Sequence, residues 1–485
     1  MQSRVALGIL LASLVTGCVR VPPRTLPDVG FEVPEVFTGA PAEAAEPAAD
    51  WWQEFGDPVL PRLVERALAH NQDLVVAAAR VERAAAEARI AGAPLKPTVG
   101  ASLSVSRQRQ NFIGFPDFGG LGGGGSASTL FSNTFDRDAL SLEASWEADL
   151  WGRLRAGARA SLAQYQAAAA ELRGARLSLA ARTARMWFAA VEAHQQVTLA
   201  EESSAGFRDV VAQVRARYEQ GLRPPLDLRL AQSNLSAAQA LLERRRAQRD
   251  AALRGLQVLL GEYPDARLTG AHPIARLIEL PPAVPVGLPA TLVGRRPDVE
   301  AAERRVVAAE QQWLAARRAL YPRLTLTAGG GTVTDTLQDL LDGDFRVWSW
   351  VAGLTQPLFQ GGRLRAGVEW AAAGGDAALA DFAVTVLRAY AEVETALAAE
   401  SYLRRERAAL EETAAHLTAA QRLSEDRYRE GLGNYLVVLE SQTRALSARS
   451  ELLTAQRRLL DNRVALHLAL GGGFEESTVA TEASR

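Results

Sequence analysis

The chain has 485 residues, with 54 basic and 56 acidic side chains and a formal charge of −2. This balance argues against nucleic acid as the main partner, because a phosphate-binding surface requires a basic excess. Hydrophobic residues make up 48% of the chain, which excludes disorder throughout. Abundant alanine, leucine and arginine with few aromatic residues favour long helices over a mixed globule.

Residues 1–17 have the organisation of a signal peptide, with a basic Arg4 before the short apolar segment 5–15. The Val-Thr-Gly-Cys ending resembles a lipobox, in which Cys18 is lipidated; an ordinary signal peptide with a chance cysteine is the alternative. Val19 follows instead of aspartate, which in such lipoproteins implies sorting to the outer membrane. No second cysteine is available for a disulfide or a cysteine-based metal site. No uncharged apolar run of about 18 residues follows Cys18, so we expect no transmembrane helix.

The rest of the chain is an internal repeat. The string RYEQGL returns as RYREGL, so that Tyr218 matches Tyr428 at an offset of 210 (428 − 218). Upstream, Asp73 matches Asp298 at an offset of 225 (298 − 73). We therefore predict two copies of one unit of roughly 200 residues.

The predicted organisation has five segments. They are a signal peptide (1–17), a lipidated extended segment (18–50), a first repeat (51–280), a second repeat (281–473) and a disordered tail (474–485). Each repeat is expected to hold two strands followed by long helices. The strands lie at about 98–107, 138–150, 323–331 and 345–356, and the helices at about 155–260 and 363–470.

The long helices are predicted from seven-residue periodicity. Residues 155–219 and 363–430 show no interruption and would each extend about 100 Å at ~1.5 Å per residue. The returning segment of the second repeat has leucine at every seventh position, from Leu439 to Leu460. This spacing predicts coiled-coil packing.

The strand segments alternate between apolar and polar residues. Leu142 and Trp146 share one face, whereas Glu143, Glu147 and Asp149 share the other. This pattern is typical of transmembrane β-barrels with interfacial tryptophan; a half-buried soluble sheet is the alternative. Three carboxylates on one inner face fit a water-filled lumen better than a dry core.

Four strands are too few to close a barrel, and an open edge in hydrocarbon leaves backbone groups unpaired. Two chains would give a barrel filled by its own side chains, whereas three would leave room for water. We therefore expect an α+β membrane protein, a trimer with a 12-stranded barrel. Its helices lie on the periplasmic side and the loops at 107–138 and 328–345 face the exterior.

Several motifs in order, from Trp51 to Gly473, resemble the TolC-like outer-membrane factors. They are DLWGRLRAG, GRRPDVEAAE, YPRLTLT, QPLFQGGRLRAG and YREGLGNYLVVLESQ. The similarity is closer to the NodT/OprM lipoprotein branch that serves RND-type efflux pumps. It implies a homotrimer in the outer membrane with a periplasmic α-helical barrel. The implied partners are a periplasmic adaptor protein and an inner-membrane RND-type pump.

The resemblance also implies a constriction near the periplasmic end, where an acidic ring of the family matches Glu440. A neighbouring position that is acidic in some relatives is Val437 here, and its repeat counterpart is Asp227 (437 − 210). Both carboxylates are gate candidates; a helix start favoured by the macrodipole is the alternative. The turn residues Gly221, Leu222, Gly431 and Leu432 are the expected adaptor contacts, with plain turn chemistry as the alternative.

We predict no catalytic, cofactor or metal site. The five histidines are scattered without zinc spacing, and the glycines at 120, 122 and 125 precede a predicted strand instead of a helix. The predicted function is passive efflux of small molecules. A type I protein-secretion duct, a metal-cation exporter and a structural coiled-coil lipoprotein tether remain the alternatives.

Overall fold

The computed structural model describes residues 37, 50–112, 131–267, 276–282, 284 and 294–472. The chain divides into the units Met1–Glu32 and Val33–Arg485, and all described residues belong to the second. The predictions for the signal peptide, for Cys18, for the glycines at 119–125 and for the tail at 474–485 lie outside the described residues.

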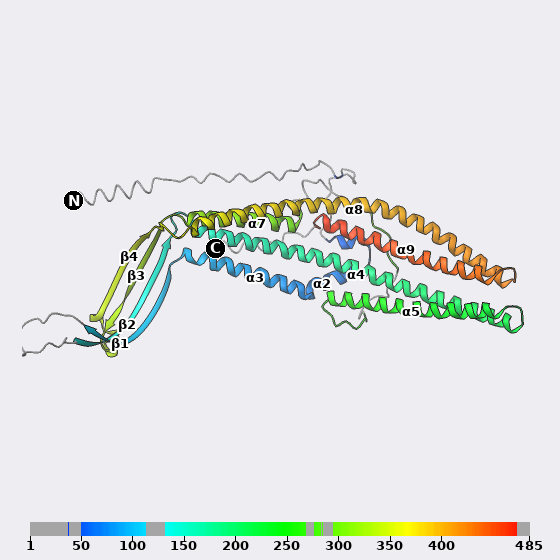
Figure 1. The fold of residues 1–485 in the computed structure, drawn as a ribbon, viewed down its shortest axis with the longest axis horizontal. Helices are drawn as coiled ribbons and strands as arrows, with labels where there is room; N and C mark the ends of the chain where they lie inside the picture. Colours follow the sequence, from blue (N-terminus) through cyan, green and yellow to red (C-terminus); the bar gives the residue numbers. More distant parts are fainter. Residues whose placement is uncertain are drawn as a thin grey trace, which may run out of the picture. The chain divides into compact units, whose positions relative to one another are not determined.

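One antiparallel sheet contains all four strands in the order β1-β2-β3-β4 (Figure 1). The strands are β1 (Thr98–Phe112), β2 (Phe131–Ala148), β3 (Arg323–Thr334) and β4 (Arg346–Thr355). Each strand pairs with the strand that follows it in the sequence, so β1 and β4 form the two edges of the sheet.

Strands β1, β2 and β3 are longer than predicted at the ends that the sequence assigned to loops. The segment 107–111 is polar on both faces, which hides the alternation, but cross-strand pairs hold it in the sheet. Arg107 Nε lies 3.4 Å from Asp136 Oδ1, and Arg109 Nη2 donates to Ser132 Oγ at 2.9 Å. The loop predicted at 107–138 is therefore partly strand. The one predicted at 328–345 holds the end of β3 and two short turns, η3 (Leu337–Leu341) and η4 (Gly343–Phe345).

The helices have the predicted order. The helical segments predicted at 155–260 and 363–470 are each divided into two helices by a glycine turn. The helices are η1 (Trp51–Phe55), α2 (Leu60–His70), α3 (Gln72–Gly92), η2 (Ala93–Leu95), α4 (Arg153–Glu219), α5 (Pro225–Leu259), α7 (Pro297–Arg318), α8 (Arg363–Arg429) and α9 (Tyr435–Ala469). The uninterrupted helices predicted at 155–219 and 363–430 are confirmed within two residues at each end.

The helix bounds recur at the offsets of the sequence motifs. Helices α4 and α8 each have 67 residues and begin 210 positions apart (363 − 153), and α5 and α9 each have 35 and begin 210 apart (435 − 225). Helices α3 and α7 begin 225 apart (297 − 72), as do β1 and β3 (323 − 98).

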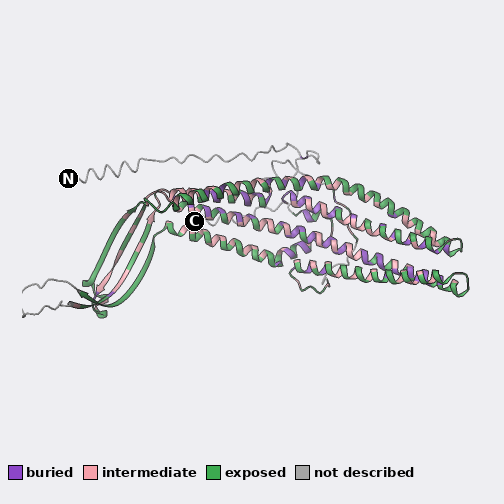
Figure 2. Ribbon diagram, viewed as in Figure 1, coloured by how far each residue is buried: buried purple, intermediate pink, exposed green. Residues whose placement is uncertain are grey.

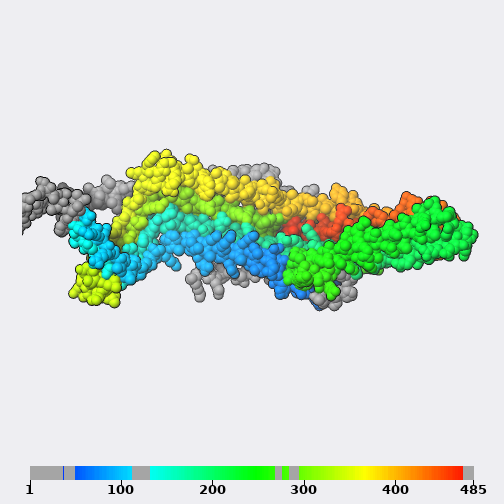
Figure 3. Space-filling view, turned by 60° about the horizontal axis from the view of Figure 1, so that its bottom comes forward, coloured from blue at the N-terminus to red at the C-terminus, as the bar shows by residue number. Residues whose placement is uncertain are grey.

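Helix α4 packs against α3, α5, α7 and α9, whereas α8 packs against α7 and α9. The buried surface of α4 near the sheet is a run of alanines that permits close helix approach, among them Ala156, Ala160 and Ala163. Helices α3, α4, α7 and α8 pack one against the next in this order, so α3 and α8 are the two outer helices. Figure 2 shows α8 mostly exposed, and Figure 3 shows α3, in blue, open on one face.

The largest apolar core joins the segment η1 to α2, α4 and the end of α9. Trp51 and Trp187 are buried in it, and the Trp187 indole donates to Asp57 Oδ2 at 2.8 Å. Trp51 stacks on the ring of His467 with centroids 5.1 Å apart. Aromatic packing therefore fixes the residues just after position 50 to the helices.

Helices α4, α5, α8 and α9 all end in the same Schellman motif. A glycine with positive φ stands at Gly221, Gly261, Gly431 and Gly471, and the residue after it donates to the carbonyl five positions back. Only Gly261 and Gly471 meet neighbouring backbone closely. A Cβ on Gly261 would lie 2.5 Å from the His70 carbonyl oxygen, whereas Gly221 has nothing within 4 Å.

Alanine at these two glycines should therefore have unequal effects. We expect Gly221→Ala to lose only the left-handed backbone preference, about 1 kcal/mol of unfolding free energy. Gly261→Ala should lose clearly more, because its methyl group also collides with the His70 carbonyl. Thermal unfolding of the two variants in detergent measures the difference; equal losses would contradict the close contact.

His467 should make stability depend on acidity. Burial, with Arg463 nearby, lowers the pKa of His467 to about 3, against about 6.5 in an unfolded chain. Between these values the unfolded state binds the extra proton, so stability falls as pH decreases from about 6.5 toward 3, by up to ~1.4 kcal/mol per pH unit. His467→Phe keeps a ring against Trp51 and should flatten this dependence. An unchanged slope in unfolding measured across pH 4 to 7 would show that another group is responsible.

Candidate functional site

Two helical turns carry the residues predicted to contact a partner. The α4–α5 turn holds Gly221 and Leu222, and the α8–α9 turn holds Gly431 and Leu432. Both leucines are exposed, and both turns have the same backbone hydrogen bonds. The Leu222 N–H donates to the Arg217 carbonyl at 2.9 Å, and the Leu432 N–H donates to the Arg427 carbonyl at 2.9 Å. The structure thus presents two equivalent turns, each with an exposed leucine.

A buried tyrosine joins the two turns. Tyr428 is 1% exposed, and the guanidinium carbons of Arg217 and Arg223 lie 4.6 and 5.4 Å from its ring centroid. The same arginines donate across the turns, Arg217 to the Arg429 carbonyl at 2.9 Å and Arg223 to the Gly433 carbonyl at 3.1 Å. We call these three side chains the arginine–tyrosine clasp. Helices α4 and α5 form one hairpin, and α8 and α9 form another. The clasp couples the ends of these two hairpins through cation–π contacts and hydrogen bonds.

A small apolar core lies beneath the clasp. It contains Val210, Val211, Val214, Ala231, Tyr428, Tyr435 and Val438. The Tyr435 hydroxyl accepts a hydrogen bond from Asn234 at 3.3 Å, and burial raises the pKa of Tyr435. Sequence reasoning missed the clasp because it treated Tyr218 and Tyr428 as equivalent, whereas Tyr218 is exposed. The arginines on both sides of Gly221 were the available signal.

The two gate candidates have different surroundings. Asp227 lies half-buried in the first turn of α5, where a carboxylate favours the helix dipole, and its charge helps to raise the pKa of Tyr435. Glu440 lies beyond the first turn of α9, is exposed, and pairs with Arg444 Nη2 at 2.6 Å. The helix-start interpretation therefore fits Asp227 and not Glu440, because the dipole effect is confined to the first turn.

The three predicted lumen carboxylates are also placed differently. Glu143 lies on β2 opposite Gly100 and Gly329, which leave its side chain free of bulky neighbours. Glu147 lies on the same face and accepts from Arg153 at 2.8 Å. One charge of this face is therefore compensated where β2 meets α4.

The prediction that Asp149 belongs to a strand is wrong. Strand β2 ends at Ala148, and Asp149 instead accepts from the backbone N–H groups of Leu154 and Arg155 at 3.1 and 2.9 Å. Burial opposes its ionisation, but these donors hold the pKa of Asp149 below its usual value. The first turn of a helix has N–H groups without internal partners, so the carboxylate serves the start of α4.

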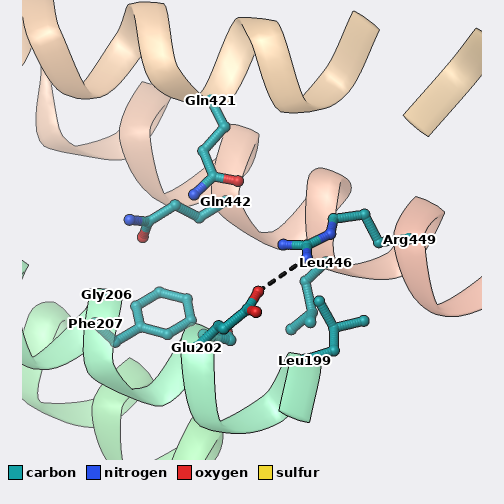
Figure 4. Close-up of a pocket in the computed structure, with 9 residues that line it drawn as sticks. Leu199, Glu202, Gly206, Phe207, Gln421, Gln442, Leu446 and Arg449 are labelled. Atoms are coloured by element: carbon teal, nitrogen blue, oxygen red, sulfur yellow. Dashed lines mark hydrogen bonds and ion pairs between the residues drawn. The ribbon is translucent and has the colours of Figure 1, made fainter. Parts of the chain in front are cut away.

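A cavity separates the clasp region from the large core. Figure 4 shows it between α4 and the pair α8 and α9, where Glu202 binds Arg449 at 2.8 Å. Its lining also includes Phe207, Gln421 and Gln442. The Gln442 amide donates to Glu425 at 2.9 Å. Polar side chains thus interrupt the apolar packing between α4 and the α8–α9 hairpin at this cavity.

A metal site would need clustered ligands among the residues that the structure describes. They contain no group of three His, Cys, Asp or Glu side chains that could hold a metal ion. The cavity beside Phe207 is lined by amides, one ion pair and apolar carbons. The contacts at the cavity, Glu202 with Arg449 and Glu425 with Gln442, join α4 to α9 and α8 to α9.

The sequence family model described as outer membrane efflux protein matches residues 63–262 and 288–472. The toluene efflux pump outer membrane protein TtgF of Pseudomonas putida is 31% identical over 482 residues, with 97% of each chain covered. Outer membrane protein OprJ of Pseudomonas aeruginosa is 32% identical, covering 97% of this chain and 96% of OprJ.

Solved channel structures have the same fold. The outer-membrane channel OprN superposes with a TM-score of 0.79 at 28% identity, covering 93% of this chain and 99% of OprN. The open state of the MtrE channel of Neisseria gonorrhoeae has a TM-score of 0.79 at 28% identity, with 94% and 98% covered.

Truncating the clasp tyrosine should loosen the two turns. Tyr428→Ala removes a buried ring, and we expect it to cost about 3–5 kcal/mol in the local opening free energy. Tyr428→Phe is the matched control, because the hydroxyl has no hydrogen-bond partner among the described residues and its loss should be nearly neutral. Hydrogen exchange of residues 210–240 and 420–445 measures this; equal protection in the alanine variant would contradict the clasp.

Proposed function

Because the chain belongs to the outer membrane efflux protein family, and is thereby an outer-membrane channel component of an efflux system, we propose that three copies form one passive duct. The observation that carries this proposal is a sheet of only four strands, open at β1 and β4, continuous with helices of 67 residues. Twelve strands would line the membrane and the helices would surround a periplasmic tunnel.

The open sheet supports closure by other copies. In hydrocarbon an unpaired backbone N–H or C=O costs several kcal/mol, so edges at β1 and β4 are not tolerated. One face of the sheet also exposes large apolar side chains, as a lipid-facing surface requires. They include Leu103, Val105, Leu142, Trp348 and Trp350. A coiled-coil tether would need neither feature.

The opposite face of the sheet supports a water-filled lumen. Glu143 is exposed and forms no ion pair with a described residue, whereas Glu147 is paired with Arg153. We expect only a mild preference for cations, because one of these two charges is compensated. The relatives named for toluene and pyoverdine efflux support small molecules, apolar ones among them, as the cargo.

The energy for transport comes from a partner in this proposal. An inner-membrane RND-type pump with its periplasmic adaptor protein would load the tunnel, and the duct would conduct passively. The exposed turns at Gly221, Leu222, Gly431 and Leu432 are the proposed adaptor contacts, because they end the two hairpins with matching geometry. Lipidation at Cys18 would add an anchor in the periplasmic leaflet.

The proposed gate is at Glu440, with Asp227 as the second candidate. Three copies of an exposed carboxylate around one axis repel each other and attract cations. Glu440 is exposed and its charge is only partly offset by Arg444, whereas Asp227 is half-buried beside Tyr435. Opening would shift the hairpins relative to each other below the polar cavity near Glu202.

Removing the gate charge should increase the resting current. We expect Glu440→Ala to raise closed-state conductance in planar bilayers and to reduce cation preference, because three carboxylates leave the constriction. Arg444→Ala is the matched control: it frees the same carboxylates and should increase cation preference. If both variants conduct as the parent does, Glu440 does not line the constriction and Asp227 becomes the residue to test.

A further inference from the structure

An apolar groove lies between α3 and α4, at the ends of these helices that meet the sheet (Figure 1). Its volume is about 590 Å³, a size typical of sites for small molecules. Leu95, Leu162 and Tyr165 contribute apolar walls, and Leu162 is 48% exposed. The groove is therefore open on one side and lined mainly by carbon.

The second repeat has bulkier side chains on the helix that corresponds to α3. Ala88, which lines the groove, corresponds to Trp313 of α7 (88 + 225). Trp313 is partly buried, and the Arg317 guanidinium carbon lies 5.4 Å from its ring centroid. The counterpart of Arg317 is Gly92 (317 − 225). Helix α3 thus lacks both partners of this cation–π contact where the groove lies.

Three arginines also line the groove. Arg89 extends from α3, and Arg155 and Arg159 extend from α4; all three are exposed. Arg155 pairs with Asp149 at 3.2 Å, whereas Arg89 and Arg159 form no ion pair with a described residue. Carbon walls beside two uncompensated guanidinium groups fit an amphiphile with an apolar chain and a negative headgroup.

The fold itself does not require these two arginines. Arg89 corresponds to Leu314 of α7 (89 + 225), and Arg159 corresponds to Glu369 of α8 (159 + 210). The second repeat forms the same pair of helices with an apolar residue and an acid at these positions. The basic groove is therefore a feature that the first repeat has in addition to the shared helix packing.

The groove continues the apolar face of the sheet. The Trp146 indole, on that face of β2, donates to the Leu95 carbonyl at 3.1 Å, and tryptophan is typical of the membrane interface. On the other face, Glu147 pairs with Arg153. Arg155 follows Arg153 by two residues, about 200° around α4, so it extends away from the polar face. The groove thus lies on the side of the helices that the apolar sheet face shares.

We propose that this groove binds an anionic phospholipid of the periplasmic leaflet, with its phosphate between Arg89 and Arg159 and an acyl chain along Leu95 and Leu162. Arginine suits a phosphate because its guanidinium presents two parallel N–H groups. Basic pockets between helices at a membrane surface bind phospholipid headgroups by this chemistry. The site rests on the proposed membrane-spanning sheet, and the bound lipid would fix the depth of the chain in the leaflet.

Lipid titration of the detergent-purified full chain, followed by native mass spectrometry, tests the charge requirement. Phosphatidylglycerol should bind about tenfold more tightly than phosphatidylcholine, whose headgroup has no net charge. Arg89→Gln combined with Arg159→Gln should weaken phosphatidylglycerol binding about thirtyfold, at about fivefold per arginine. The matched control is Arg83→Gln, which removes a charge from another face of α3, where Arg83 pairs with Glu87, and should leave binding unchanged.

Filling the groove tests the acyl-chain requirement separately. Ala88→Trp introduces the residue that the second repeat has at this position and leaves the three arginines in place. Phosphatidylglycerol binding should weaken by about fourfold for each acyl CH₂ that loses its contact. Thermal unfolding shows whether this variant is folded. If it is not, Leu162→Gln, which makes the exposed wall polar, should weaken binding in the same direction.

Soluble anions separate a lipid site from an anion site. Glycerol phosphate and inorganic phosphate should not displace phosphatidylglycerol; displacement at the same concentrations would show that the groove binds a free phosphate and would overturn the proposal. Phosphatidylglycerol binding that occurs only after Cys18→Ser would assign the groove to the chain's own acyl anchor, with the same consequence. Unchanged affinity in both the arginine variant and the Ala88→Trp variant would also contradict the site.

The lipid site and the duct can fail separately. Oligomeric mass and conductance, measured on the same preparation, test the duct. A conducting trimer without selective phosphatidylglycerol binding refutes only the groove, whereas a chain that neither assembles nor conducts refutes the duct on which the groove depends.

Discussion

The unpaired backbone of β1 and β4 is the constraint on which the rest of the molecule depends. Within one chain the hydrogen-bonded ladders join β1 to β4 only through β2 and β3, so one edge of each outer strand has no partner in the sheet. Water can satisfy such groups, but hydrocarbon cannot. One apolar sheet face, exposed Trp348 and Trp350 and open edges therefore support the proposal that copies of the chain close into one barrel.

The helices show the same incompleteness. Helices α4 and α9 bury apolar faces inside the chain, whereas α3 and α8 keep Val76, Trp370 and Leu387 exposed. Apolar surface of this extent marks an interaction site. The sheet and the helices are thus both incomplete along the two outer edges of the chain, and the proposed duct would cover both.

The sequence predicts the long helices and their turns well, because seven-residue periodicity and left-handed glycines are local signals. Strand ends are predicted poorly, since residues 107–111 are polar on both faces and are held by cross-strand partners such as Asp136. Asp149 was misplaced because alternation continues in the sequence after β2 ends. The clasp was not predictable from the repeat, because burial of Tyr428 depends on Arg217 and Arg223 reaching it from another hairpin.

Oligomeric mass measured together with single-channel conductance tests the central claim most directly. The detergent-purified protein should have the mass of three chains and show small, gated, cation-preferring currents in a planar bilayer. A water-soluble species that conducts no current after removal of its lipid would contradict the duct.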